Sequence, residues 1–105
     1  MAATSQITVN AVGFTAVTVQ NTLGCKNVRI LEDPGVAGWP TSDFLIAKPL
    51  ATSTPVRIPA GDAYTFSAAS QNPANASASW FAPGLVVGYV KTISGSTTFD
   101  QDEDQ

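Results

Sequence analysis

Four carboxylates in the middle of this sequence are of the residue type that could carry acid–base chemistry. They are Glu32, Asp33, Asp43 and Asp62. A pair of such groups flanking a sugar bond is the arrangement that glycoside hydrolysis requires. Glu32 and Asp33 precede a Pro-Gly turn, however, and Asp62 follows Gly61 in another turn. Because acidic side chains commonly bond the amides of turns, we interpret all four as solvated turn residues.

The other residues that could do chemistry are few. The chain has no histidine and one cysteine, Cys25, so a Ser-His-Asp or Cys-His catalytic set is impossible. A reactive thiol needs a cationic neighbour, and Lys26 points to the opposite face if this segment is extended. We interpret Cys25 as a small buried side chain. The acidic end of the chain lacks the glycine and the spacing of a calcium loop. The sequence therefore predicts no enzyme, no metal site and no cofactor.

The charge is low and unevenly placed. Only 12% of the residues are charged, 44% are hydrophobic, and the net charge is −3. Four of the eight acidic residues lie in residues 100–105, and the five basic residues are scattered. Nucleic-acid binding needs clustered Lys and Arg, and a bilayer span needs roughly 20 apolar residues. We therefore expect neither nucleic acid nor membrane as a partner. One cysteine and no secretory signal are typical of a chain that folds in cytoplasm.

The elements that must position these residues have a period of two, which is typical of strands. Gly- and Pro-rich breakers separate eight short runs. The runs cover residues 6–10, 13–21, 26–32, 43–47, 54–59, 62–68, 85–93 and 96–100. This pattern predicts an all-β fold, a small antiparallel β-sandwich or β-barrel of about seven or eight short strands. We expect one domain over residues 1–99 with a short N-terminal arm (1–6), followed by a solvated acidic C-terminal tail (100–105).

Two segments have a sharper interpretation. Residues 56–66 are predicted to form a hairpin, because Pro59 fixes φ and Gly61 can take a positive φ in the turn. The register of that hairpin directs Tyr64 and Phe66 to the same face. Residues 85–93 are apolar on both faces in the middle, so they are predicted to form a central strand.

The aromatic residues in and near loops have two possible roles. Trp80 and Phe81 are consecutive, so in an extended segment one faces the core and the other does not. Trp39 lies in a Gly- and Pro-rich loop. Such side chains either fold back as lids on a small core or contact a partner. As contact anchors we select Trp39, Phe44, Trp80 and Phe81, with the arm of residues 1–6 as a docking segment.

Three segments carry a resemblance to a known family. They are "CKNVRILED" as an early strand, "VRIPAGDAYTF" as a strand, a turn and an aromatic strand, and "PGLVVGYVKTISGSTTF" as a closing β-hairpin, all between residues 25 and 99. In this pattern the chain resembles the head decoration proteins of tailed phages, also called accessory or cement proteins. The resemblance implies a β-rich virion protein without catalytic residues, made in the host cytoplasm. It further implies binding to the major capsid protein on the outer shell, often as a homotrimer that bridges coat subunits.

Two alternatives remain open from the residues. One is a carbohydrate-binding module of a fibre or adhesin, in which Trp39, Trp80 and Tyr64 form a platform for sugar rings. The other is a tail or adaptor component of a virion.

Overall fold

The computed structural model describes residues 3–48, 54–68 and 80–104. Within these residues the chain forms eight strands and no helix. The strands are β1 (Ala3–Asn10), β2 (Thr15–Thr18), β3 (Asn27–Glu32), β4 (Phe44–Ala47), β5 (Val56–Ile58), β6 (Tyr64–Ser67), β7 (Val86–Thr92) and β8 (Ser96–Asp104). Each falls on one of the eight runs that alternate in the sequence, so the all-β prediction is confirmed. In the same residues we find no helix with the length and hydropathy needed to cross a bilayer.

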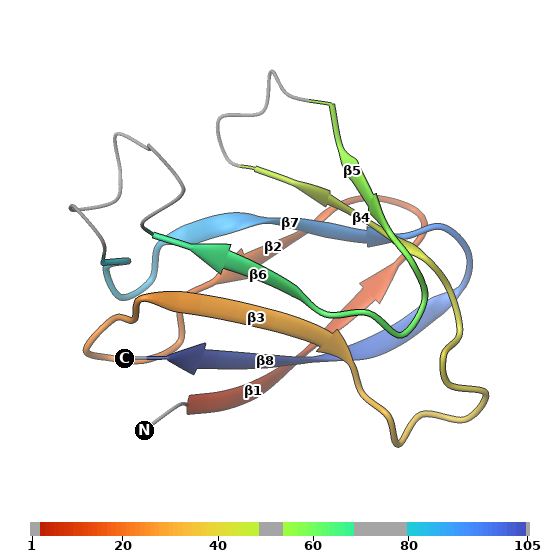
Figure 1. The fold of residues 1–105 in the computed structure, drawn as a ribbon, viewed down its shortest axis with the longest axis horizontal. Helices are drawn as coiled ribbons and strands as arrows, with labels where there is room; N and C mark the ends of the chain where they lie inside the picture. Colours follow the sequence, from red (N-terminus) through yellow and green to blue (C-terminus); the bar gives the residue numbers. More distant parts are fainter. Residues whose placement is uncertain (1–2, 49–53, 69–79, 105) are drawn as a thin grey trace.

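The strands pair antiparallel in two four-stranded sheets (Figure 1). Sheet A has the order β1-β8-β3-β6, and sheet B has the order β2-β7-β4-β5. The pairs β1·β8, β2·β7, β3·β6 and β4·β5 are nested, as in one long hairpin rolled up along its length. The pairs β3·β8 and β4·β7 complete the sheets. This order is that of an eight-stranded jelly roll, a form of β-sandwich.

The core lies between the two sheets. Phe44 of sheet B meets Phe99 of sheet A edge to face, with ring centroids 4.9 Å apart. Gly88 of β7 faces Phe66 of β6 so closely that an added Cβ would overlap Phe66 Cε1 and lie 2.8 Å from Cζ. The other fully buried apolar residues of the cluster are Val9, Val17, Cys25, Val28, Ile30, Ala68, Phe81, Val87 and Val90. Side chains of both sheets therefore share one interior.

The hairpin predicted for residues 56–66 is wrong, although its turn is right. Asp62 N donates to Pro59 O at 3.1 Å, and Gly61 has a φ of 86°. The strands on either side, β5 and β6, nevertheless lie in different sheets. The physical reason is that Ile58 and Phe66 pack against the same core from opposite sides. The turn crosses the sandwich, and Tyr64 and Phe66 still meet edge to face at 4.9 Å.

The closing hairpin expected from β7 and β8 is not formed either. The segment from Gly84 to Phe99 is not a local hairpin, because β7 lies inside sheet B and β8 lies inside sheet A. The central position predicted for residues 85–93 is confirmed, since β7 has β2 on one side and β4 on the other.

The boundaries assigned to the arm and the tail were wrong. β8 continues to Asp104, between β1 and β3, so most of residues 100–105 form a central strand. Gln101 and Glu103 are fully buried. Ala3 pairs with Glu103 and Gln6 with Asp100, so residues 3–6 belong to an ordered strand. Residues 1, 2 and 105 lie outside the described part of the chain.

Candidate functional site

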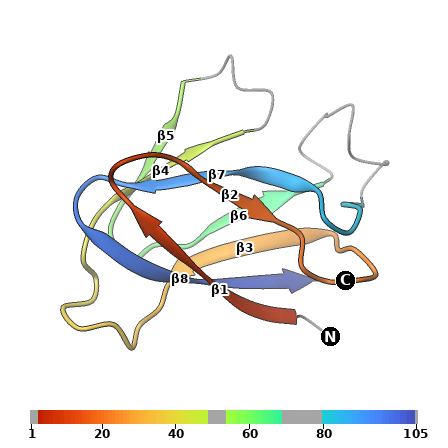
Figure 2. The ribbon, with the colours of Figure 1, turned by 180° about the vertical axis from the view of Figure 1, so that it is seen from behind.

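Four connections gather at one end of the sandwich, which we call the loop end. They are residues 11–14, 33–43, 59–63 and 93–95, which follow β1, β3, β5 and β7. The β1–β2 and β7–β8 connections lie side by side in both views (Figures 1 and 2). Loops held on a rigid scaffold are the usual place for binding residues. The loop end is therefore the candidate functional site.

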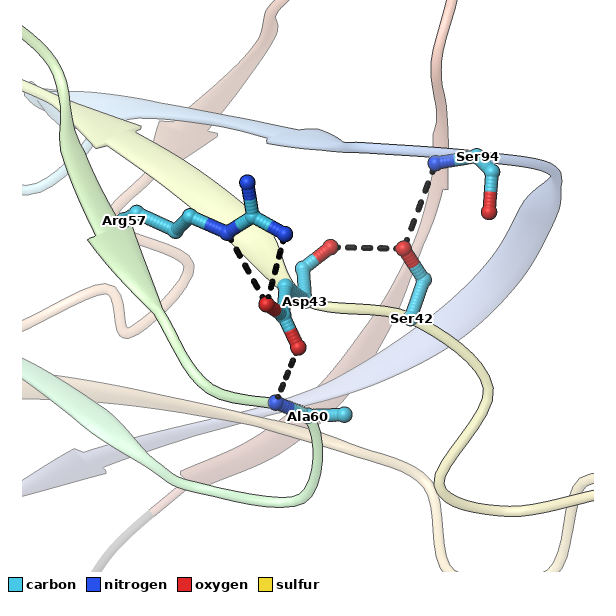
Figure 3. A network of polar contacts seen from close by, with 5 residues as sticks. All are labelled: Ser42, Asp43, Arg57, Ala60 and Ser94. Atoms are coloured by element: carbon cyan, nitrogen blue, oxygen red, sulfur yellow. Dashed lines mark hydrogen bonds and ion pairs between the residues drawn. The ribbon is translucent and has the colours of Figure 1, made fainter.

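Asp43 ties the β3–β4 connection to the β5–β6 connection (Figure 3). Its Oδ1 accepts a hydrogen bond from Ala60 N at 2.9 Å. Its Oδ2 accepts from Arg57 Nε at 2.9 Å and lies 2.8 Å from Arg57 Nη2. The bond from the Ala60 amide, followed by the bond from Arg57, lowers the pKa of the Asp43 carboxyl below its ordinary value. The ionised side chain is therefore the form that holds these two segments together.

The β7–β8 connection is attached at the same point. Ile93 N donates to the carbonyl oxygen of Asp43 at 3.0 Å. Ser94 N donates to Ser42 Oγ at 3.2 Å, and Ser42 Oγ in turn donates to the Asp43 carbonyl at 2.7 Å. Ser42 and Asp43 thus join three of the four connections of the loop end.

Glu32 fixes the base of the β3–β4 connection from inside the protein. Only 2% of its surface is exposed. Its Oε1 accepts from Thr41 N at 2.9 Å, and its Oε2 accepts from Thr41 Oγ1 and, at 2.7 Å, from Thr97 Oγ1. Burial alone would raise the pKa of Glu32, but the bonds from Thr41 and Thr97 outweigh it and leave the pKa below its ordinary value. The prediction of a solvated turn residue is wrong for Glu32.

Two further side chains stabilise loop-end turns locally. Asn10 Oδ1 accepts from Val12 N at 3.0 Å and from Gly13 N at 3.3 Å. Asp33 Oδ1 accepts from Gly35 N at 2.9 Å. Asp33 therefore serves its turn as predicted. These bonds limit the conformational freedom of the segments that reach into solvent.

The loop end exposes apolar side chains. Val12 is 94% exposed, Phe14 42%, Ile93 40% and Trp39 39%. They come from three of the four connections. Exposed apolar groups held on an ordered framework are typical of an interaction site.

The four selected contact residues have different positions. Trp39 lies at the loop end, against the turn at Gly61, where an added Cβ would be 3.6 Å from Trp39 Cζ2. Phe44 and Phe81 are fully buried, so they cannot be surface anchors, and that prediction is wrong for both. Phe44 points inward from β4 of sheet B, and Phe81 points inward from its bridge to Cys25. Both side chains therefore belong to the core. Trp80 is half-buried, which agrees with the expectation that only one of the Trp80–Phe81 pair faces the core.

Trp80 lies at the opposite end of the sandwich. Its Nε1 donates to Leu23 O at 3.1 Å, in the connection that precedes β3, whereas Trp39 lies in the connection that follows β3. Tyr64 packs against Phe66 and the core. The three rings proposed as a sugar platform therefore do not share one face.

A second buried carboxylate, Glu103, holds the connection before β3, and the sequence interpretation missed it. Glu103 Oε2 accepts from Gln20 N at 2.6 Å and from Gln101 Nε2 at 2.8 Å, while its Oε1 accepts from Asn21 N at 2.7 Å. Gln101 Nε2 also donates to Thr18 O at 2.7 Å. The signal that could have revealed it is the period of two, which continues inward from Phe99 through Gln101 to Glu103.

Ligands for a metal ion are not gathered in the part of the chain described. No three His, Cys, Asp or Glu side chains there form a set that could hold a metal ion. Cys25 is fully buried, as expected. Burial, Glu103 and then Asp104 raise its pKa to about 11, so the thiol form dominates at neutral pH and is a weak nucleophile.

No protein-family model matches this chain, and no curated protein or solved structure is significantly similar to it.

Proposed function

We propose that this chain is a structural protein of a virus particle that binds the outer surface of an assembled coat shell through its loop end. The observation that carries the proposal is the combination found there: connections tied together through Ser42 and Asp43, with Val12 and Ile93 displayed to solvent. A pre-ordered apolar surface loses little conformational entropy on binding, which favours protein contact. The resemblance of residues 25–99 to phage head decoration proteins supplies the shell as the partner.

The mechanism is physical. The major capsid protein presents neighbouring subunits on the assembled shell, and a decoration protein seated across their junction bridges them. A protein that binds the assembled shell but not the free subunits stabilises the shell by mass action. A homotrimer would multiply the contacts made at one junction. Trp39, at the rim of the loop end, is the aromatic contact residue in this proposal.

The first experiment is to determine copy number in purified particles from the source by quantitative mass spectrometry. A fixed ratio to the major coat protein, near one or a simple fraction of it, supports the proposal. A handful of copies per particle would instead favour a tail or adaptor component. Absence from the particles would overturn the proposal, and sugar binding would then be tested.

The loop end itself is tested by binding purified variants to particles that lack the protein. Val12→Asp combined with Ile93→Asp places two charges among the exposed apolar groups, so shell binding should fall by at least about tenfold. The matched control is Leu23→Asp, because Leu23 is 71% exposed and lies at the opposite end. Equal binding by both variants would refute the assignment of the loop end.

A further inference from the structure

The outer face of sheet B is a partly apolar surface with two cations. The strand register places Lys91 of β7 beside Leu45 of β4, and Leu45 beside Arg57 of β5. A parallel row runs through Ala16, Tyr89 and Ala47. Arg57 is exposed, and Leu45 and Lys91 are half-buried. The strand residues of this face lie outside the four connections of the loop end, and the proposed function names no contact for them.

The charge of this face is positive. Arg57 is paired with Asp43, so these two groups offset each other. Lys91 adds one net positive charge, and its Nζ lies 5.8 Å from the centre of the Phe14 ring. The face therefore combines aromatic and aliphatic groups with a cation, a surface suited to an anionic partner.

The outer face of sheet A has the opposite charge. Asp100, Asp102 and Asp104 alternate along β8, which lies inside this sheet. Arg29 of β3 is the cation beside them, with its Nη1 3.5 Å from Asp102 Oδ2. Two net negative charges remain among these four residues. An open hollow of about 380 Å³ lies over β3, β6 and β8, and it is lined by Asp102 and Asp104 together with Arg29.

We propose that the outer face of sheet B binds a second copy of this chain, through the outer face of that copy's sheet A. Contact between two B faces would bring Lys91 toward its own counterpart, and contact between two A faces would oppose two rows of aspartates. Like charges in contact are unfavourable, whereas the B-to-A contact joins opposite charges and offers a hollow to a cationic side chain. A contact between different faces is head to tail, and it closes into a ring if the rotation allows.

The test is sedimentation velocity of the purified chain over a series of concentrations and of NaCl concentrations. We expect association that grows with concentration and weakens with salt, because the contact is between charged faces. Lys91→Glu reverses the charge of the B face and should weaken association by about tenfold or more. Asp100→Lys combined with Asp104→Lys reverses the A face and should do the same. Combining all three substitutions restores opposite charges, so association should return.

The matched control is Lys26→Glu, which changes the net charge as Lys91→Glu does. Lys26 N donates to Asp104 O, so the new negative charge lies beside the A face and does not oppose contact with the cationic B face. It should not weaken association. Circular dichroism of each variant establishes that it is folded. A chain that stays monomeric at millimolar concentration overturns the proposal, and so does failure of the triple variant to recover association while folded. Self-association does not depend on what the loop end binds, so this experiment and the particle experiments fail separately.

Discussion

The two buried glutamates differ in the kind of donor they bind, and this difference predicts unequal effects of the same substitution. Glu103 is fully buried and accepts from three N–H groups, of Gln20, Asn21 and Gln101. Glu32 is 2% exposed and accepts one N–H and two hydroxyl groups. An N–H group can only donate, whereas a hydroxyl can donate or accept.

Replacing each glutamate by glutamine keeps the shape and exchanges one acceptor oxygen for a donor NH₂. In Glu103→Gln, either orientation of the amide sets its NH₂ against an N–H group, so buried donors lose their acceptor. Each such donor costs about 1–3 kcal/mol, so we expect a loss of about 2–4 kcal/mol in the free energy of unfolding. In Glu32→Gln, the amide oxygen can keep Thr41 N while the hydroxyls of Thr41 and Thr97 turn to accept. Only the assistance of the charge is lost, at about 1 kcal/mol.

The assay is urea unfolding at pH 7 followed by circular dichroism, with the m-value checked to be unchanged. Asp62→Asn is the control, because Asp62 is an exposed carboxylate, and it should change the free energy of unfolding by less than about 0.5 kcal/mol. Equal losses for Glu103→Gln and Glu32→Gln, or a larger loss for Glu32→Gln, would refute the reasoning from donor type.

Three further predictions follow from the same structure. The folded-state pKa of Glu32 lies below its ordinary value of 4.5. Its contribution to stability is therefore present above pH 4.5 and is lost as the pH falls through the folded-state pKa. Urea unfolding between pH 7 and pH 3 should show a smaller acid-induced loss in the free energy of unfolding for Glu32→Gln than for the wild type. Cys25 should resist iodoacetamide at pH 8 in the folded chain and react readily in urea, since it is buried with a pKa of about 11; equal rates would contradict this. Gly88→Ala should lower the free energy of unfolding by about 3 kcal/mol, because its Cβ would overlap Phe66, while Gly13→Ala, with no atom within 4 Å of its Cβ, should change it by less than about 1 kcal/mol.

The strands could be predicted from the sequence, but their partners could not. Alternation and breakers are local, and they located all eight strands. Pairing is decided by which strands share the core: β5 and β6 follow one turn, yet Ile58 and Phe66 reach the same interior from opposite sheets. A favourable turn at Gly61 is compatible with a hairpin and with a crossing between sheets. The choice between them depends on residues far away in the sequence.

The burial of side chains in the acidic C-terminal segment could not be predicted from the sequence either. Charge composition predicts a solvated tail, since carboxylates rarely lie in a core without partners. Glu103 is buried because Gln20 and Asn21, more than 80 residues earlier, bring two backbone amides to it. Its own neighbours in sequence give no sign of those donors. Trp39 could be placed in a loop because a Gly- and Pro-rich segment is visible in sequence, whereas the burial of Phe44 and Phe81 depends on how the sheets pack.

Several acidic side chains of this fold hold loops in place by accepting hydrogen bonds from their backbone amides. The described residues contain two ion pairs, yet Glu32, Asp33, Asp43 and Glu103 each accept from backbone amides of loops. A carboxylate that accepts from a backbone amide orders a connection whether or not a cation is paired with it, as Arg57 is with Asp43. Among the described residues, the β2–β3, β3–β4 and β5–β6 connections are therefore each held by a carboxylate that accepts from one of their backbone amides. The exposed ring of Trp39 projects from the β3–β4 connection, which Glu32, Asp33 and Asp43 hold in place, so the contact proposed for this ring would be made from an ordered segment.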